Sequence, residues 1–162
     1  MAVIDQEEAR LWIALSLIPG LGSQTLCKLL SAFGEPAAIC AASISQLKDV
    51  VGRDIAEAIA QGGEPEQLQT SIDWLKQENN HLVTLSDGHY PQALLEISDP
   101  PPILYAKGDL SVLERKAIAM VGSRNATAQG EKNAEEFAYA LCNSGLCVVS
   151  GMALGIDGAA PG

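Results

Sequence analysis

The sequence predicts an α/β protein in which a small helical domain precedes a parallel sheet. Three observations support this fold class. Apolar residues recur at helical spacing from residue 5 to residue 62, and beyond residue 80 the apolar runs become short and are bounded by turns. Near the end, two uninterrupted apolar runs, 117–121 and 146–149, flank a helical segment, and each leads into a glycine turn. A buried strand, a helix and a second buried strand form a parallel βαβ unit, which holds ligands at the tips of its strands.

The composition is that of a globular chain. Of its 162 residues, 48% are hydrophobic, which is enough to form a buried core. The amino terminus is acidic, and the apolar run 11–18 is too short to span a bilayer, so we expect a cytoplasmic protein with no signal peptide and no membrane segment. The net charge of −10 argues against nucleic-acid binding through bulk attraction. A polyanion would have to be held by a few placed cations and by backbone amides at helix starts.

Four cysteines, Cys27, Cys40, Cys142 and Cys147, are distributed without CxxC spacing among apolar neighbours. This pattern predicts buried, reduced thiols rather than disulfides or a zinc site. No metal and no cofactor are implied.

The first predicted helix begins at Asp5, which with Glu8 resembles a capping box, and ends at Pro19-Gly20. Ser23 is expected to cap the second helix, whose apolar face is followed by Gly34. Shorter helices follow: one is opened by a proline, one is capped by a serine with a glutamine, and one runs from residue 53 to residue 61. We therefore expect a small helical bundle.

The turn between the first two helices, Leu17-Ile18-Pro19-Gly20-Leu21-Gly22-Ser23, resembles a helix-hairpin-helix module. In such a turn the glycines allow close approach, and the free N–H groups of the following helix point at a phosphate. Gly20, Gly22 and Ser23 are the candidate contacts. A plain turn between packed helices is the alternative, and the turn alone does not decide between them.

Gly62-Gly63-Glu64-Pro65 interrupts the helical periodicity and is the best candidate linker. The predicted domains are thus 1–62, helical, and 63–162, which contains the sheet. A helix that ends near residue 79 opens the second domain. Two short strands, 82–85 and 103–106, follow, and a stiff proline-rich connection lies between them.

The last predicted helix runs from Gln129 to Asn143, with Ala134, Phe137, Ala138 and Leu141 on its apolar face, and the apolar strand after it is expected to be buried on both sides. A crossover of this kind places the tips of the two strands side by side. The segments that follow the strands, Gly122-Ser123-Arg124 and Ser150-Gly151, should therefore meet at one edge of the sheet.

This edge carries the residues that an anion requires. Glycines allow close approach, serine hydroxyls donate to phosphate oxygens, and Arg124 offers a bidentate contact. The GxGxxG pattern of dinucleotide-binding proteins and the Walker lysine are both absent from this sequence. His81 and His89 lie in the connecting region, away from a nucleophile. Asp157 is the carboxylate nearest this edge, and a helix cap or a catalytic role are its two interpretations.

Two blocks of sequence carry a specific resemblance. V-G-S-R-x-x-T, followed after a helix by V-V-S-G-M-A-L-G-I-D-G-A-A, resembles the DNA-processing protein family known as DprA or Smf. The upstream segments Y-P-Q-A-L-L and D-P-P-P-I-L-Y-A-K-G-D resemble the same family. The resemblance covers essentially the whole chain.

This resemblance implies a helix-hairpin-helix or SAM-like helical domain followed by a Rossmann-like domain. It implies sequence-independent binding of single-stranded DNA, protection of incoming DNA during natural transformation, loading of the RecA recombinase, and a homodimer. No enzymatic activity is implied. Carried over to this sequence, the phosphate-binding residues are Gly122, Ser123, Arg124, Ser150 and Gly151.

The sequence departs from the family pattern after residue 160, where it reads Pro161-Gly162 and stops instead of continuing with a histidine and further strands. We therefore expect a truncated form that has an incomplete Rossmann-like sheet and lacks the dimer surface. Two alternatives to DNA binding stay open. One is a phosphoribohydrolase-like enzyme that uses the same anion pocket, and the other is a non-functional fragment.

Overall fold

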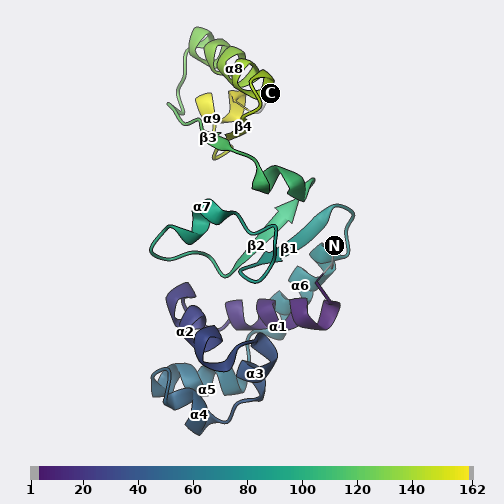
Figure 1. Cartoon of the computed structure of the whole chain (residues 1–162), viewed down its shortest axis with the longest axis vertical. Helices are drawn as coiled ribbons and strands as arrows, with labels where there is room; N and C mark the ends of the chain where they lie inside the picture. Colours follow the sequence, from purple (N-terminus) through teal and green to yellow (C-terminus); the bar gives the residue numbers. More distant parts are fainter. Residues whose placement is uncertain (1–3, 161–162) are drawn as a thin grey trace. The chain divides into compact units, whose positions relative to one another are not determined.

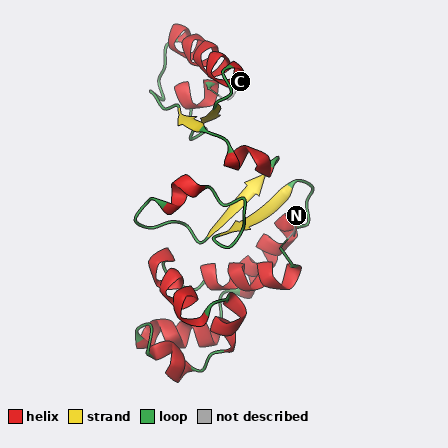
Figure 2. Ribbon diagram, in the orientation of Figure 1, coloured by secondary structure: helices red, strands yellow, loops and turns green. Residues whose placement is uncertain are grey.

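The computed structural model describes residues 4–160 and contains both helices and strands, which confirms the α/β class (Figures 1 and 2). Its contacts divide the chain into two compact units, Met1–Leu110 and Ser111–Gly162. The predicted domain boundary between residues 62 and 63 lies inside the first unit and stays a prediction. The first three residues of the amino terminus and the predicted stop at Pro161-Gly162 lie outside the described residues.

The first unit begins with the predicted bundle of short helices. These helices are α1 (Gln6–Ser16), α2 (Ser23–Phe33), α3 (Pro36–Ala41), α4 (Ile44–Lys48) and α5 (Arg53–Gln61). Aliphatic side chains from all of them form what we call the bundle cluster, which comprises Leu15, Ile18, Leu21, Leu26, Leu29, Ile39, Leu47, Val51, Ala56 and Ile59. Burial of these side chains holds together helices that are too short to be stable alone.

Two of the predicted helix caps are wrong. Asp5 occupies the N-cap position of α1, but its side chain makes no capping hydrogen bond, and Glu8 instead accepts a hydrogen bond from Trp12 Nε1 at 3.4 Å. The N-cap of α2 is Gly22, so Ser23 is the first residue of the helix rather than its cap. The reason is that Gly22 already has the extended conformation of a cap residue, with φ −73° and ψ 166°.

A second apolar cluster joins α1 to the rest of this unit. Helix α6 (Pro65–Leu75) is followed by strands β1 (Asn80–Thr84) and β2 (Ile103–Lys107), which pair antiparallel. The hairpin cluster, as we call it, comprises Ala9, Trp12, Ile13, Ile72 and Leu82. Within this unit α1 therefore lies between the other bundle helices and the β1–β2 pair (Figure 1).

The long connection between β1 and β2 contains the short helix α7 (Gln92–Leu95) and is tied to itself. Tyr90 is 2% exposed, and its hydroxyl donates a hydrogen bond to the carbonyl oxygen of Pro101 at 2.7 Å. This bond satisfies a buried polar group and holds the proline-rich segment against the hairpin.

The second unit contains the predicted βαβ arrangement. The 3-10 helix η1 (Leu110–Glu114) leads to β3 (Ala117–Ala119), α8 (Ala128–Asn143), β4 (Cys147–Val149) and α9 (Ile156–Ala159). Strands β3 and β4 pair in parallel, with Ile118 opposite Val148. The helical region followed by a small parallel sheet is thus confirmed.

The predicted burial of this sheet is wrong. Ala134 and Ala138 of α8 are buried, but Phe137 is 67% exposed and Val149 of β4 is 52% exposed. Within the described part of this unit, α8 contacts both β4 and α9, and its buried residues are small alanines. Its larger side chains point outward, and the strands are covered only in part.

None of the helices in the described part of the chain is both long and apolar enough to cross a lipid bilayer.

The cysteines are less buried than predicted. All four are free thiols, and Cys40 and Cys142 are exposed. Packing around the thiols nevertheless raises the pKa of Cys40, and burial with the nearby charge of Asp99 raises the pKa of Cys27.

The raised pKa of Cys40 has a testable consequence for its reactivity. Because the thiolate is the reactive form, a raised pKa lowers its fraction at a given pH and moves the alkylation profile to higher pH. In a chain whose other three cysteines are replaced by serine, we expect the iodoacetamide rate to reach half its maximum at a higher pH than for free N-acetylcysteine amide. In urea the two profiles should coincide, and coincidence in the folded chain would contradict this assignment.

Candidate functional site

The parallel pairing of β3 and β4 brings the two following loops together. The N–H of Met120 donates to the carbonyl oxygen of Val149 at 2.8 Å, which extends the ladder beyond β3. The N–H of Ile156 then donates to the carbonyl oxygen of Ser123 at 3.2 Å. The structure thus places Gly122-Ser123-Arg124 beside the loop that begins with Ser150-Gly151, while their role in binding stays a prediction.

Asp157 joins the two loops. Its side chain is 9% exposed, and its Oδ1 atom accepts a hydrogen bond from the N–H of Gly122 at 3.0 Å. The backbone carbonyl oxygen of the same residue accepts a hydrogen bond from Ser150 Oγ at 2.8 Å. The expected helix cap is wrong, because the N-cap of α9 is Gly155. A buried carboxylate that receives a backbone N–H makes a charge-assisted bond, which is stronger than a neutral one.

The glycines of the site allow the two loops to pack closely against each other, while the approach of a ligand to their backbone stays a prediction. A Cβ atom on Gly122 would lie 2.6 Å from the Cβ of Ile156, and one on Gly151 would lie 3.0 Å from Asp157 Oδ2. Gly155 has φ +82°, and a Cβ there would collide with the carbonyl oxygen of Ser123. The space beside these glycines is therefore filled by the chain itself.

The hydrogen-bonding groups of the site are partly engaged. The N–H of Gly122 and the hydroxyl proton of Ser150 are both used in the contacts with Asp157. Ser123 Oγ accepts a hydrogen bond from the N–H of Asn125 at 3.2 Å, which leaves its own proton to donate. Of the two predicted serine donors, Ser123 is thus the one that this arrangement leaves for an anion.

Arg124 is the cation of the site. It is exposed, and within residues 4–160 it takes part in no ion pair. The loop that carries it leads to Thr127, whose Oγ1 caps α8 by accepting the N–H of Gly130 at 3.1 Å. A free guanidinium on a fixed loop before the positive end of a helix favours a phosphate group.

Two exposed apolar residues of the second loop were not among the candidate site residues predicted from the sequence. Met152 has the unusual φ of +56° and is 72% exposed, and Leu154 is 82% exposed. In the sequence they lie in the glycine turn that follows the second apolar run, and no pattern there marks them as exposed. Their exposure gives the edge an apolar component beside Arg124.

The helix-hairpin-helix candidates lie in the first unit. Gly20 has φ +80°, and a Cβ there would lie 3.1 Å from Ile55 Cδ1, so the turn packs closely against α5. Gly22 caps α2 with no side-chain hydrogen bond, which leaves the first amides of this helix to other partners. The phosphate contacts proposed for Gly20, Gly22 and Ser23 stay predictions.

Comparison with known proteins then decides the family. The model of the DNA recombination-mediator protein A family matches residues 81–161, half of the chain, including both loops of the site. The chain belongs to this family. The DprA or Smf resemblance of the sequence motifs is thereby confirmed.

Relatives and solved structures agree with this assignment. The DNA processing protein DprA of Bacillus subtilis is 34% identical over 119 residues, which are 70% of this chain and 40% of the relative. The protein Smf of Synechocystis is 32% identical over 157 residues, which are 93% of this chain and 39% of the relative. The X-ray structure of DprA from Streptococcus pneumoniae matches 98% of this chain and 53% of its own, with a TM-score of 0.69 and 29% identity. The chain thus spans about 40% of the length of these curated relatives.

Proposed function

We propose that this chain binds single-stranded DNA through its phosphates, without sequence preference, as part of DNA processing. The observation that carries the proposal is Arg124, an exposed cation with no ion pair among the described residues, on a loop that Asp157 fixes in place. Membership of a recombination-mediator family and relatives named DNA processing proteins support it. We expect no sequence preference, because contacts to phosphates position a strand but carry no sequence information.

The charge of the chain sets the expected strength of this interaction. With a net charge of −10, the protein repels a polyanion at long range, so binding depends on local contacts. Besides Arg124, the cations nearest in sequence are Lys116 and Lys132, and Lys132 faces Glu136 at 3.9 Å. Exposed Met152 and Leu154 offer apolar contact to bases or sugars of an unpaired strand. We expect weak, salt-sensitive binding.

A single substitution tests the proposal. Replacing Arg124 by alanine should weaken the binding of a labelled single strand about tenfold, because a charge-assisted contact contributes about 1.5–3 kcal/mol. The slope of log affinity against log salt should become smaller by about one unit. Fluorescence anisotropy at several salt concentrations measures both quantities.

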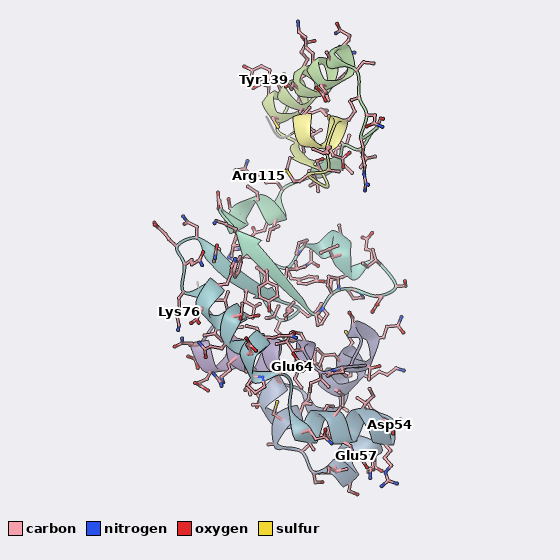
Figure 3. The ribbon with its side chains drawn as sticks, turned by 180° about the vertical axis from the view of Figure 1, so that it is seen from behind. Asp54, Glu57, Glu64, Lys76, Arg115 and Tyr139 are labelled. Carbon is pink, nitrogen blue, oxygen red and sulfur yellow. The ribbon has the colours of Figure 1, made fainter. Side chains whose placement is uncertain are left out.

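The matched control is Arg115→Ala, which removes an exposed arginine from the same unit but outside both loops (Figure 3). This control should bind as the parent chain does. Equal weakening by the two substitutions would show that only bulk charge matters, and equal affinity for duplex DNA would contradict single-strand binding.

A finer proposal concerns partners. We infer that the DNA-bound chain hands its strand to the RecA recombinase during natural transformation, as the family resemblance implies. The description of the family as recombination mediators supports this inference. Adding RecA and ATP to the same labelled strand should speed filament growth, and unchanged growth would contradict the transfer.

A further inference from the structure

The first unit contains a cavity of about 330 Å³ that is separate from both proposed phosphate contacts. It lies at the junction of the start of α1, the end of α6, strand β1 and the turn after β1. Its walls are mainly aliphatic and include Ile72, Leu75, Leu82 and Leu110. This volume falls within the range of pockets that bind small molecules, about 300–1,000 Å³.

The backbone of β1 offers a hydrogen-bonding pair at this cavity. Gly108 N–H donates to Asn79 at 2.8 Å and Leu85 N–H donates to Pro102 at 3.1 Å, so the hydrogen-bonded positions of β1 are the odd-numbered ones. Leu82, opposite Tyr105, is therefore in a non-hydrogen-bonded pair. Its N–H and C=O point away from β2, to an edge along which no strand pairs within residues 4–160.

The cavity wall also contains a buried hydrogen-bond acceptor that has no donor among the described residues. Asn80 is 8% exposed, and its Nδ2 donates to the carbonyl oxygen of Trp74 at 2.7 Å. Its Oδ1 atom is buried and has no hydrogen-bond partner among the described residues. Leaving such an acceptor unsatisfied costs about 1–3 kcal/mol, which a ligand with a hydrogen-bond donor can recover.

The charges at the wall favour a neutral occupant. Lys76, labelled at the end of α6 in Figure 3, is paired with Asp73 at 2.7 Å. Asp87 Oδ1 accepts the backbone N–H of His89 at 2.9 Å. The cation is thus already neutralised, and an anionic ligand would meet an acidic side chain at the same wall.

We propose that this cavity binds an uncharged heteroaromatic ring of the nucleobase class. The flat ring packs between the aliphatic side chains of the cavity. Its adjacent donor and acceptor match the C=O and N–H of Leu82. A second donor on the ring then bonds Oδ1 of Asn80. Such a base can belong to a free nucleoside or to an unpaired position of a polynucleotide. The inference does not depend on the phosphate contact of Arg124.

The test is an NMR titration of the full ¹⁵N-labelled chain with adenosine. We expect saturable shifts of the Leu82 amide and the Asn80 side chain with a Kd of about 1 mM or tighter. N6,N6-dimethyladenosine, which lacks the donor of the amino group, should bind about tenfold more weakly, since an unsatisfied buried partner costs about 1–3 kcal/mol. A short single-stranded adenine oligonucleotide, compared with the nucleoside, distinguishes the two sources of the base.

Two variants of helix α6 test whether the base binds in this cavity. Leu75→Trp fills the cavity from a half-buried position and should abolish binding. Leu68→Trp changes a half-buried residue of the same helix that does not line the cavity, and should bind as the parent does. Thermal unfolding shows that both variants fold. If neither adenosine nor the oligonucleotide produces saturable shifts, or if binding survives Leu75→Trp, the proposal is overturned.

Discussion

Replacing Trp12 by alanine should lower the free energy of unfolding of the first unit by about 3–5 kcal/mol, the range for removing a large buried aromatic side chain. Trp12 is 1% exposed and lies in the hairpin cluster, where α1, α6 and β1 meet. The cavity left behind cannot be filled, because residues from three elements surround it. Urea unfolding followed by far-ultraviolet circular dichroism measures the loss.

Trp74→Ala is the matched control for this prediction. Trp74 is only half-buried and contacts the ring of Tyr105 edge-on, with the ring centroids 5.5 Å apart. Its replacement should cost clearly less than that of Trp12, because part of its side chain already faces solvent, and the aromatic pair accounts for about 1 kcal/mol of the loss. Equal losses for the two tryptophans would contradict the assignment of Trp12 to the centre of the core.

Replacing Asp157 by alanine should lower the stability of the second unit by about 1.5–3 kcal/mol, because the substitution leaves the N–H of Gly122 without its charged acceptor. The same change should free the loop that carries Arg124 and weaken any DNA binding that depends on this residue. Amide hydrogen exchange of Gly122, together with urea unfolding, measures the effect on the loop.

Asp157→Asn separates the hydrogen bond from the charge. An asparagine Oδ1 can still accept the N–H of Gly122, so we expect most of the stability and the slow exchange of Gly122 to return. If asparagine proves as damaging as alanine, the carboxylate charge rather than the hydrogen bond holds the loops together. A chain with alanine that is as stable as the parent would contradict the linking role altogether.

Several features followed correctly from the sequence pattern, although two of the helix caps did not. The parallel pairing of β3 with β4 follows from two apolar runs around one helix, and the capping box of Ser43 and Gln46 appears as expected. Burial was harder to predict. Phe137 falls on the apolar face of its helix by spacing, yet it is exposed, because burial depends on what packs against that face.

The contacts that hold the two loops of the candidate site together cannot be predicted from the spacing of residues in the sequence. Asp157 and Gly122 are 35 positions apart, and only the register of β3 on β4 brings them within hydrogen-bonding distance. The same holds for the cavity beside β1. Its hydrogen-bonding pair at Leu82 depends on which positions of the antiparallel ladder are bonded, and a shift of one residue would exchange the two sets.

Helix α1 contributes to both apolar clusters of the first unit, through Leu15 in one and Trp12 and Ile13 in the other. The bundle cluster and the hairpin cluster therefore share helix α1. Unfolding of either one removes part of the core of the other. Proteolytic cleavage within Gly62-Gly63-Glu64-Pro65 would leave two pieces that remain associated. We therefore expect the two parts of the first unit on either side of this predicted linker to unfold together.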